Sequence, residues 1–185
     1  LNIVSKLEYD SQPMNIETIQ VVPFARGIVA DYLNTGIDVQ YDLEFFDTPT
    51  VQECAIQGDE RLLRRAVRNL IDNAMRHNGE GCKIALSLDV EPSNMLALTV
   101  ADNGRGCDTS RIGALMAQAS TPDASYDAHG LGLTLVSRIS IMHGGYVSFA
   151  SEPKRGFTAT MRIPIAMPQS EPTRPEQRES QANVR

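Results

Sequence analysis

Four short stretches of this 185-residue sequence decide how it folds. They read Asn69-Leu-Ile-Asp-Asn73-Ala-Met-Arg76-His77-Asn78, then Asp102-Asn-Gly104-Arg-Gly106, then Gly130-Leu-Gly132-Leu, and finally Gly156-Phe-Thr-Ala-Thr160-Met. The first lies on a predicted helix, the second follows an apolar strand, the third opens a helix and the fourth opens a strand. Each stretch alone is a weak signal, but their order and spacing together form a specific pattern.

Helical periodicity surrounds the first and third stretches. The spacing predicts a helix from Asp59, which can cap its N-terminus, to about His77. Its buried stripe is expected to comprise Leu63, Val67, Leu70, Ile71 and Ala74. A second helix is predicted over 130–143, ended by two glycines that suit a left-handed cap. A third is predicted to begin at Pro23 and to run to about Leu33.

Alternating apolar residues predict the strands. They are expected at about 15–22, 39–45, 83–90, 95–101, 146–150 and 157–163, with a further short strand near 51–56. A short helix is possible around 112–118.

The chain divides into three parts. Residues 1–10 place Ile3, Val4 and Leu7 at helical spacing, as the tail of a helix would, and the start at Leu1 suits a fragment of a longer chain. Residues 11–165 carry the predicted elements, including a segment at 107–129 that is longer than an ordinary loop, as functional lids are. Residues 166–185 lack the apolar content to pack, which predicts a disordered tail.

Composition excludes several classes of protein. The chain is 42% hydrophobic and 22% charged, as soluble globular proteins are. A net charge of −6 without a basic stripe argues against nucleic-acid binding, and no apolar run is long enough to span a membrane. Cys54, Cys82 and Cys107 are odd in number and form no CxxC pair, which argues against a disulfide framework or a zinc site.

The first stretch places polar side chains on one side of its helix. At about 100° per residue, Asn69, Asn73 and Arg76 lie on one narrow face, with His77 at its edge. An asparagine carbonyl is a neutral oxygen ligand that suits Mg²⁺, which takes few protein ligands and fills its other positions with water and phosphate. The same pattern also suits a polar helix side that faces solvent.

The second and third stretches add a carboxylate and glycines, which leave the backbone accessible to a ligand. Asp102 can accept a hydrogen bond from the exocyclic amine of adenine, where guanine presents a carbonyl. Gly104 and Gly106 would let the backbone turn sharply beside it, although a plain Asp-Asn-Gly turn has the same sequence. Gly130 and Gly132 open a helix whose N-terminus could hold phosphate, although a simple helix start explains them too.

In order and spacing, the four stretches resemble the N, G1, G2 and C-terminal glycine boxes of the catalytic and ATP-binding domain of bacterial sensor histidine kinases, in the GHKL superfamily of ATPases and kinases. The resemblance covers about residues 11–165. With the predicted elements it implies an α/β two-layer sandwich of the Bergerat type, in which about three helices cover one face of a mixed five-stranded sheet. Residues 1–8 resemble the end of the preceding dimerisation and phosphotransfer helix.

The resemblance also implies roles for single residues. Asn73 resembles the magnesium ligand, and Asn69 and Arg76 resemble contacts to phosphate or to the metal shell; these three are the candidate catalytic residues. The other candidate nucleotide-binding residues are His77 as a ring beside the nucleotide, Asp102 as the adenine reader, Gly104 and Gly106 in its turn, Gly130, Leu131 and Gly132 at the far end of an ATP lid, and Thr160.

The sequence departs from the family pattern in the lid. Residues 107–129 lack the Phe-rich box that commonly anchors it, and Leu115 and Met116 are the bulky residues there. Cys107 and Asp108 follow the second stretch where an apolar residue is usual.

The resemblance implies a kinase rather than an ATPase. Hydrolysing relatives typically carry a glutamate at the position of Asn69, and an amide cannot act as a general base. None of the three histidines is followed by an acidic residue, as the phosphoacceptor usually is. We therefore expect the chain to bind ATP and Mg²⁺ and to transfer the γ-phosphoryl group to a histidine of a neighbouring domain.

The resemblance also names partners. They are the parent protein's own dimerisation and phosphotransfer domain and a cognate response regulator, in a homodimeric parent of the bacterial inner membrane whose catalytic domain is cytoplasmic. Two alternatives remain open, namely an anti-sigma-type serine kinase and a nucleotide-binding module with impaired transfer.

Overall fold

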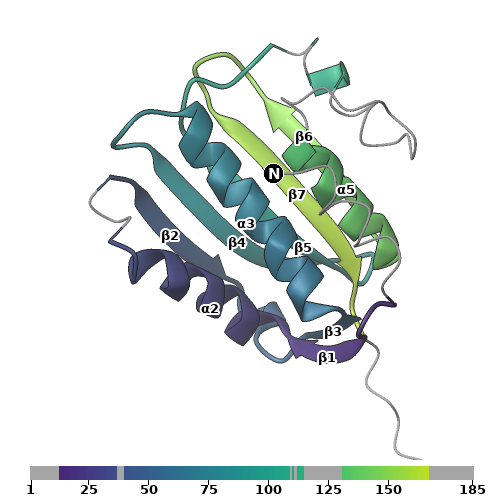
Figure 1. Ribbon diagram of the computed structural model, residues 1–185. Helices are drawn as coiled ribbons and strands as arrows, with labels where there is room; N and C mark the ends of the chain where they lie inside the picture. The colour runs from purple at the N-terminus through teal and green to yellow at the C-terminus, as the bar shows by residue number, and fades with distance from the viewer. Residues whose placement is uncertain (1–12, 37–39, 109, 111, 115–130, 167–185) are drawn as a thin grey trace, which may run out of the picture.

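A mixed five-stranded sheet forms one layer of the protein, and three α-helices cover one of its faces in the described part of the chain (Figure 1). The computed structural model describes residues 13–36, 40–108, 110, 112–114 and 131–166. The strand order is β2-β4-β5-β7-β6, with β2 and β4 parallel and the other pairs antiparallel. The predicted α/β two-layer sandwich is confirmed.

The elements follow one another in this order: β1 (Glu17–Gln20), α2 (Val21–Leu33), β2 (Asp42–Asp47), the 3-10 helix η2 (Pro49–Val51), β3 (Ala55–Gly58), α3 (Glu60–His77), β4 (Lys83–Glu91), β5 (Met95–Asp102), α5 (Leu131–Met142), β6 (Tyr146–Ser151) and β7 (Phe157–Pro164).

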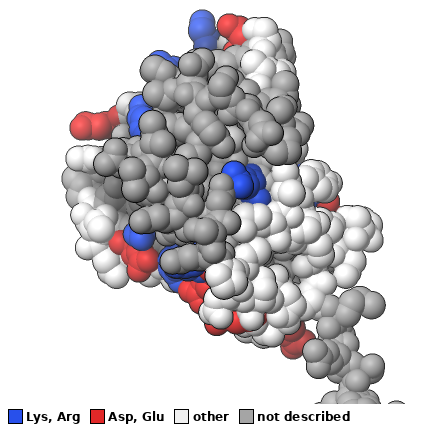
Figure 2. Space-filling view, turned by 45° about the vertical axis from the view of Figure 1, so that its right-hand side comes forward, with Lys and Arg blue, Asp and Glu red and all other residues white. Residues whose placement is uncertain are grey.

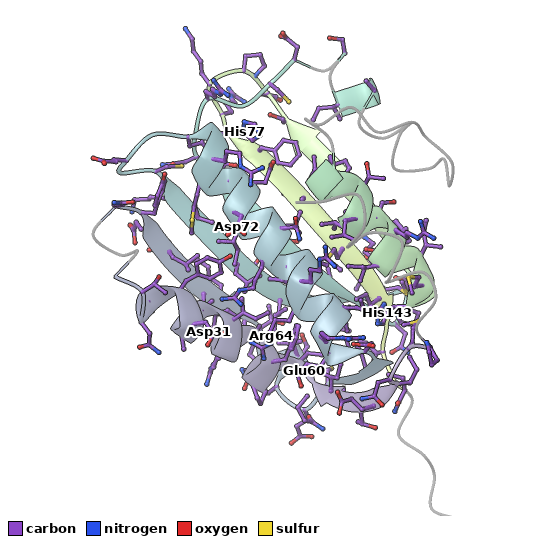
Figure 3. The ribbon with its side chains drawn as sticks, in the orientation of Figure 1. Asp31, Glu60, Arg64, Asp72, His77 and His143 are labelled. Carbon is purple, nitrogen blue, oxygen red and sulfur yellow. The ribbon has the colours of Figure 1, made fainter. Side chains whose placement is uncertain are left out.

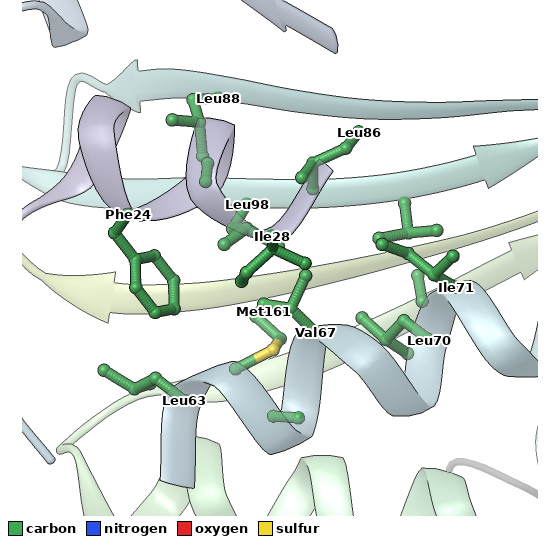
Figure 4. Packing of buried hydrophobic residues seen from close by; sticks show 14 of the residues in the cluster. Phe24, Ile28, Leu63, Val67, Leu70, Ile71, Leu86, Leu88, Leu98 and Met161 are labelled. Carbon is green, nitrogen blue, oxygen red and sulfur yellow. The ribbon is translucent and has the colours of Figure 1, made fainter. Parts of the chain in front are cut away.

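Alternation along the central strands builds the core. Every second side chain of β4, β5 and β7 is buried toward the helices, namely Ile84, Leu86, Leu88, Leu96, Leu98, Val100, Ala159, Met161 and Ile163. Residues from α2 and α3 meet these side chains between the layers (Figure 4). The sheet therefore has a core face under the helices and an opposite face that is more polar.

Helix α3 is fixed by its cap and its stripe. The Asp59 side chain accepts a hydrogen bond from the Leu62 N–H at 3.1 Å, as predicted for an N-cap. The predicted stripe is confirmed, because all five of its residues are buried: Leu63, Val67, Leu70, Ile71 and Ala74. The stripe holds α3 on the sheet and leaves the adjacent side of the helix for other contacts.

The C-terminal end of α5 is tied to the start of α3. Gly144 has a φ of +72°, so the predicted left-handed cap is confirmed. The buried His143 ring accepts a hydrogen bond from the Asp59 N–H at its Nε2 (3.0 Å), and its Nδ1 lies 2.7 Å from the Ile139 carbonyl. The Asp59 carboxylate also accepts from the Asn15 N–H at 3.1 Å. The buried residues Asp59 and His143 thus form a joint that connects the segment just before β1 to α3 and α5.

The first and third strands differ from their predictions. The predicted strand over 15–22 is shorter, because the chain turns into α2 at Val21. Near 51–56 the chain first forms η2, which Pro49 opens, and the strand follows at Ala55. β1 and β3 pair with each other in a separate antiparallel sheet, an arrangement that the sequence did not predict.

Several predictions concern residues that the structure does not describe. The helix tail at 1–10, most of the lid at 107–129 and the tail beyond residue 166 lie outside the described ranges, as does the second half of the helix expected at 112–118. Ala166 itself is described, and its N–H donates to the Ala55 carbonyl at 2.8 Å. Among the described helices, none has the length and apolar character that crossing a membrane requires.

Candidate nucleotide-binding site

The predicted polar row of α3 lies beside the buried stripe. Asn69 and Asn73 are half-buried, and Arg76 is exposed. Asn73 forms no hydrogen bond within the described part of the chain, where no buried side-chain oxygen or nitrogen lacks a partner. Its amide is therefore open to solvent and able to bind a ligand.

Asn69 brings the first and third stretches together. Its Nδ2 donates to the Arg65 carbonyl at 2.7 Å, which leaves Oδ1 directed away from α3. A Cβ added to Gly132, in the first turn of α5, would lie 3.2 Å from that Oδ1. The N-terminus of α5 thus approaches the amide row of α3, and the glycine keeps the approach close.

Asp72, the acidic residue of the first stretch, belongs to the fold. The Tyr32 hydroxyl donates to Asp72 Oδ1 at 2.5 Å, on the side of α3 that faces α2. Burial raises the pKa of Tyr32 above its ordinary value, and the hydrogen bond to Asp72 adds to this effect. Figure 3 shows Asp72 midway along α3 and His77 at its end, far from Glu60 and His143. The Asp72 carboxylate is thus held by the packing of α2 against α3.

Asp102 ends β5 with one carboxylate oxygen held in place. Its Oδ1 accepts hydrogen bonds from the Gly104 N–H at 2.9 Å and from the Phe157 N–H at 3.3 Å. The side chain is half-buried, and no described residue donates to Oδ2. The fold therefore orients the carboxylate and leaves one oxygen available as an acceptor.

Two glycines let the turn after β5 pack on the β6–β7 hairpin. Gly106 has a φ of +60°, and a Cβ there would lie 2.0 Å from the Glu152 carbonyl oxygen. Gly156 has a φ of +86°, and its Cβ would lie 1.7 Å from the Asp102 carbonyl oxygen. Gly106 and Gly156 are needed here because the backbones of the second and fourth stretches touch.

Asn78 joins the end of α3 to the turn after β5, and the sequence analysis gave it no role. Its Nδ2 donates to the Ala74 carbonyl at 2.9 Å, and its Oδ1 accepts from the Arg105 N–H at 3.1 Å. A helix-end asparagine is a recognisable signal, but its partner lies 27 residues away along the chain.

Asn103 holds the same turn from the side of β4 and was also missed. Its Oδ1 accepts from the Lys83 N–H at 2.9 Å and from the Cys82 thiol at 3.3 Å. Burial raises the pKa of Cys82, and the charge of Asp102 raises it further. The turn that carries Asp102 is therefore fastened to its neighbours on both sides.

An open hollow of about 490 Å³ adjoins this turn. It lies between residues 77–82 and 103–105, and His77 lines it with its Nδ1 3.5 Å from an Arg105 guanidinium nitrogen. Neither Asn69 nor Asn73 lines it. On the visible described surface, Lys and Arg side chains are scattered and form no continuous basic stripe (Figure 2).

The remaining predicted residues lie apart from this group or outside the description. Thr160 is on the face of the sheet opposite the helices, where its hydroxyl lies 3.0 Å from that of Thr99. The structure therefore does not bring Thr160 together with Asn73 and Asp102. Leu131 begins α5, and Gly130 lies outside the described residues.

Comparison with curated proteins finds sensor kinases. The Bacillus subtilis sensor histidine kinase YvrG is 29% identical over 165 residues, which is 87% of this chain and 28% of YvrG. The Salmonella typhimurium sensor protein BasS is 33% identical over 125 residues, 68% of this chain and 34% of BasS. The chain thus spans about a third of the length of these relatives.

Solved structures share the fold. The catalytic domain of histidine kinase ThkA superposes with a TM-score of 0.68 at 18% identity, covering 82% of this chain and 98% of that domain. Full-length ShkA in complex with AMPPNP gives 0.67 at 21% identity, over 85% of this chain and 33% of ShkA. Residues 58–167, more than half of the sequence, match the family of histidine kinase-, DNA gyrase B- and HSP90-like ATPases. The chain therefore belongs to that family, as a catalytic domain of the sensor histidine kinase type.

Proposed function

We propose that this domain binds Mg-ATP between α3, the first turn of α5 and the turn after β5, and transfers the γ-phosphoryl group to a histidine of a neighbouring domain. The observation that carries the proposal is the approach of Gly132 to Asn69, with 3.2 Å between an added Cβ and Oδ1. It puts a helix N-terminus, which favours anions, beside a row of amides that can bind a cation.

The α3 side chains fit the phosphate end of the ligand. Asn73 offers an amide oxygen without a described partner, and Asn69 directs its Oδ1 toward α5. Arg76, one turn further on, is exposed and can contact phosphate oxygens. When bound, Mg²⁺ would offset the charge of the phosphates, with most of its ligands coming from phosphate and water.

Asp102 fits the base end. Its Oδ1 is fixed by two backbone N–H groups, so the second oxygen has a defined direction in which to accept from the exocyclic amine of adenine. A guanine carbonyl at the same place would face this acceptor without a hydrogen bond, which is costly in a half-buried site. The carboxylate therefore supports selection of adenine over guanine.

The acids of α3 favour transfer over hydrolysis. Asp72 is held by Tyr32, and Glu60 pairs with Arg64 at 2.7 Å in the first turn. The residue one turn before Asn73 is Asn69, whose amide cannot take a proton from water. The chain would therefore hold the γ-phosphoryl group by positioning and electrostatics until an acceptor arrives.

The described histidines are poor acceptors. His143 is buried, with both ring nitrogens facing backbone groups, and His77 lies at the end of α3 beside Arg105. We therefore propose that the acceptor belongs to a dimerisation and phosphotransfer domain of the parent protein. The relatives that are named sensor histidine kinases support a two-component pathway, and we propose with it a response regulator as partner and a homodimeric inner-membrane parent with this domain in the cytoplasm.

The test mixes this chain with its parent's phosphoacceptor domain, Mg²⁺ and γ-labelled ATP. We expect acid-labile label on the acceptor domain and none when Asn73→Ala replaces the wild type. An absence of label while ATP still binds would overturn transfer and leave a nucleotide-binding module. Acid-stable label on a serine would instead favour an anti-sigma-type serine kinase.

A further inference from the structure

We infer that Asn78 is a positioning residue that sets the adenine selectivity of Asp102. This inference rests on the proposed function, because it assigns Asn78 a part in reading the base. Asn78 would act through the turn of residues 102–105 and need not touch the nucleotide.

The Asn78 side chain makes two hydrogen bonds in opposite directions. At the C-cap of α3 its backbone is extended, with φ −122° and ψ 159°, so its own N–H reaches only Met75 O, at 3.4 Å. The side-chain Nδ2 satisfies the Ala74 carbonyl instead, and Oδ1 holds the Arg105 N–H at 3.1 Å. The Asn78 amide thus bridges α3 and the turn through hydrogen bonds to Ala74 and Arg105.

The Asn78 amide occupies the space that a side chain at position 104 would need. A Cβ at Gly104 would lie 1.8 Å from Asn78 Oδ1 and 2.1 Å from its Cγ. Gly104 is not among the glycines with positive φ, so its backbone conformation does not require glycine. The absence of a side chain at 104 is what lets the Asn78 amide reach Arg105.

The Asp102 carboxylate and the Asn78 amide accept hydrogen bonds from two consecutive backbone N–H groups. Asp102 Oδ1 binds the Gly104 N–H at 2.9 Å, and Asn78 Oδ1 binds the N–H of the next residue, Arg105. Asn103 anchors the turn to β4 on the other side. Without the Asn78 acceptor, the 104–105 peptide is free to rotate, which loosens the adjacent Gly104 N–H and leaves the Phe157 N–H as the other donor that orients the Asp102 carboxylate.

Two substitutions separate this role from simple capping of α3. Asn78→Asp keeps an acceptor for the Arg105 N–H but loses the donor to the Ala74 carbonyl. Asn78→Ser loses both contacts, because its hydroxyl lies about where the Cγ of Asn78 lies and is too short to reach either partner. Calorimetry with Mg²⁺ gives the dissociation constants of ATP and GTP, and their ratio measures selectivity. The thermal midpoint measures stability.

We expect Asn78→Ser to reduce the discrimination between ATP and GTP about fivefold to tenfold, as the loss of one hydrogen bond implies, and Asn78→Asp to retain most of it. The thermal midpoint should fall in both variants, because each loses the hydrogen bond to the Ala74 carbonyl. Unchanged discrimination in both variants, or loss in Asn78→Asp alone, would overturn the inference. A wild-type chain that binds no ATP would instead overturn the proposed function.

Gly104→Ala provides a second, independent test. In the wild-type background the added Cβ should push the Asn78 amide away and reduce the discrimination between ATP and GTP about as much as Asn78→Ala does. In the Asn78→Ala background the three atoms nearest to that Cβ are gone, so its additional effect should be smaller. Equal effects of Gly104→Ala in the two backgrounds would show that the two positions are uncoupled.

Discussion

Replacing Asp59 with alanine should destabilise the domain by about 2 kcal/mol without altering the nucleotide site. The change removes the N-cap of α3, which costs about 1 kcal/mol. It also leaves the Asn15 N–H without its 3.1 Å acceptor, at about 1 kcal/mol more. The ion pair with Arg61 adds little, because the Arg61 side chain is 55% exposed and the separation is 3.6 Å.

Denaturant unfolding measures this loss directly, and the thermal midpoint should fall by about 4–8 °C. Asp31→Ala is the matched control, because Asp31 forms only an exposed ion pair with Arg64 at 3.3 Å and should cost less than about 0.5 kcal/mol. If Asp59→Ala and Asp31→Ala cost the same, the account of the joint formed by Asn15, Asp59 and His143 is wrong.

The same variant should change the response of the protein to acid. Burial by itself would raise the pKa of Asp59, but hydrogen bonds from the backbone of Asn15 and Leu62 outweigh it and hold the pKa below its usual range. A lowered native pKa stabilises the fold at pH values above the unfolded pKa of about 3.9, and this contribution is lost as the pH falls through the native value. The stability difference between wild type and Asp59→Ala should therefore shrink below about pH 4, whereas a constant difference would contradict the assigned hydrogen bonds.

Three further predictions address the proposed function. Asn73→Ala should abolish Mg-dependent ATP binding in calorimetry, while Asn34→Ala, an exposed asparagine at the end of α2, should not; unchanged affinity in Asn73→Ala would refute the metal assignment. Asp102→Asn should cut the preference for ATP over GTP about tenfold or more, because an amide can present a donor where the adenine amine needs an acceptor; retained preference would count against Asp102 as the base reader. The isolated chain should hydrolyse ATP very slowly in a phosphate-release assay, since Asn69 cannot activate water, and fast turnover would place it with the hydrolysing relatives.

The sequence predicted best those elements that carry their own signals. Helix α3 combines a capping aspartate with apolar residues at 3.6-residue spacing over 18 residues, so its ends and its buried side were both predictable. The β6–β7 hairpin is local and bounded by turn residues. The pairing of β1 with β3 was not predictable, because these strands are joined by α2 and β2 and periodicity carries no information on partners.

The candidate site followed from the order and spacing of the four stretches and not from single side chains. Asn73 and Asp102 were proposed because they match positions of the family pattern, whereas Asn78 depends on a turn that only the folded chain brings near. The placement of Thr160 could have been recognised, because Ala159 and Met161 on either side of it are the apolar members of the alternation. A period of two assigns Thr160 to the opposite face.

The joint formed by Asn15, Asp59 and His143 has a mechanical consequence. It pins the start of α3 to the end of α5, at the point where the chain enters the domain. The other end of α5, where Gly132 faces Asn69, lies a helix length away from this joint. The contacts at the joint can therefore be weakened without a direct change at the Gly132 end of α5, as the Asp59→Ala prediction requires.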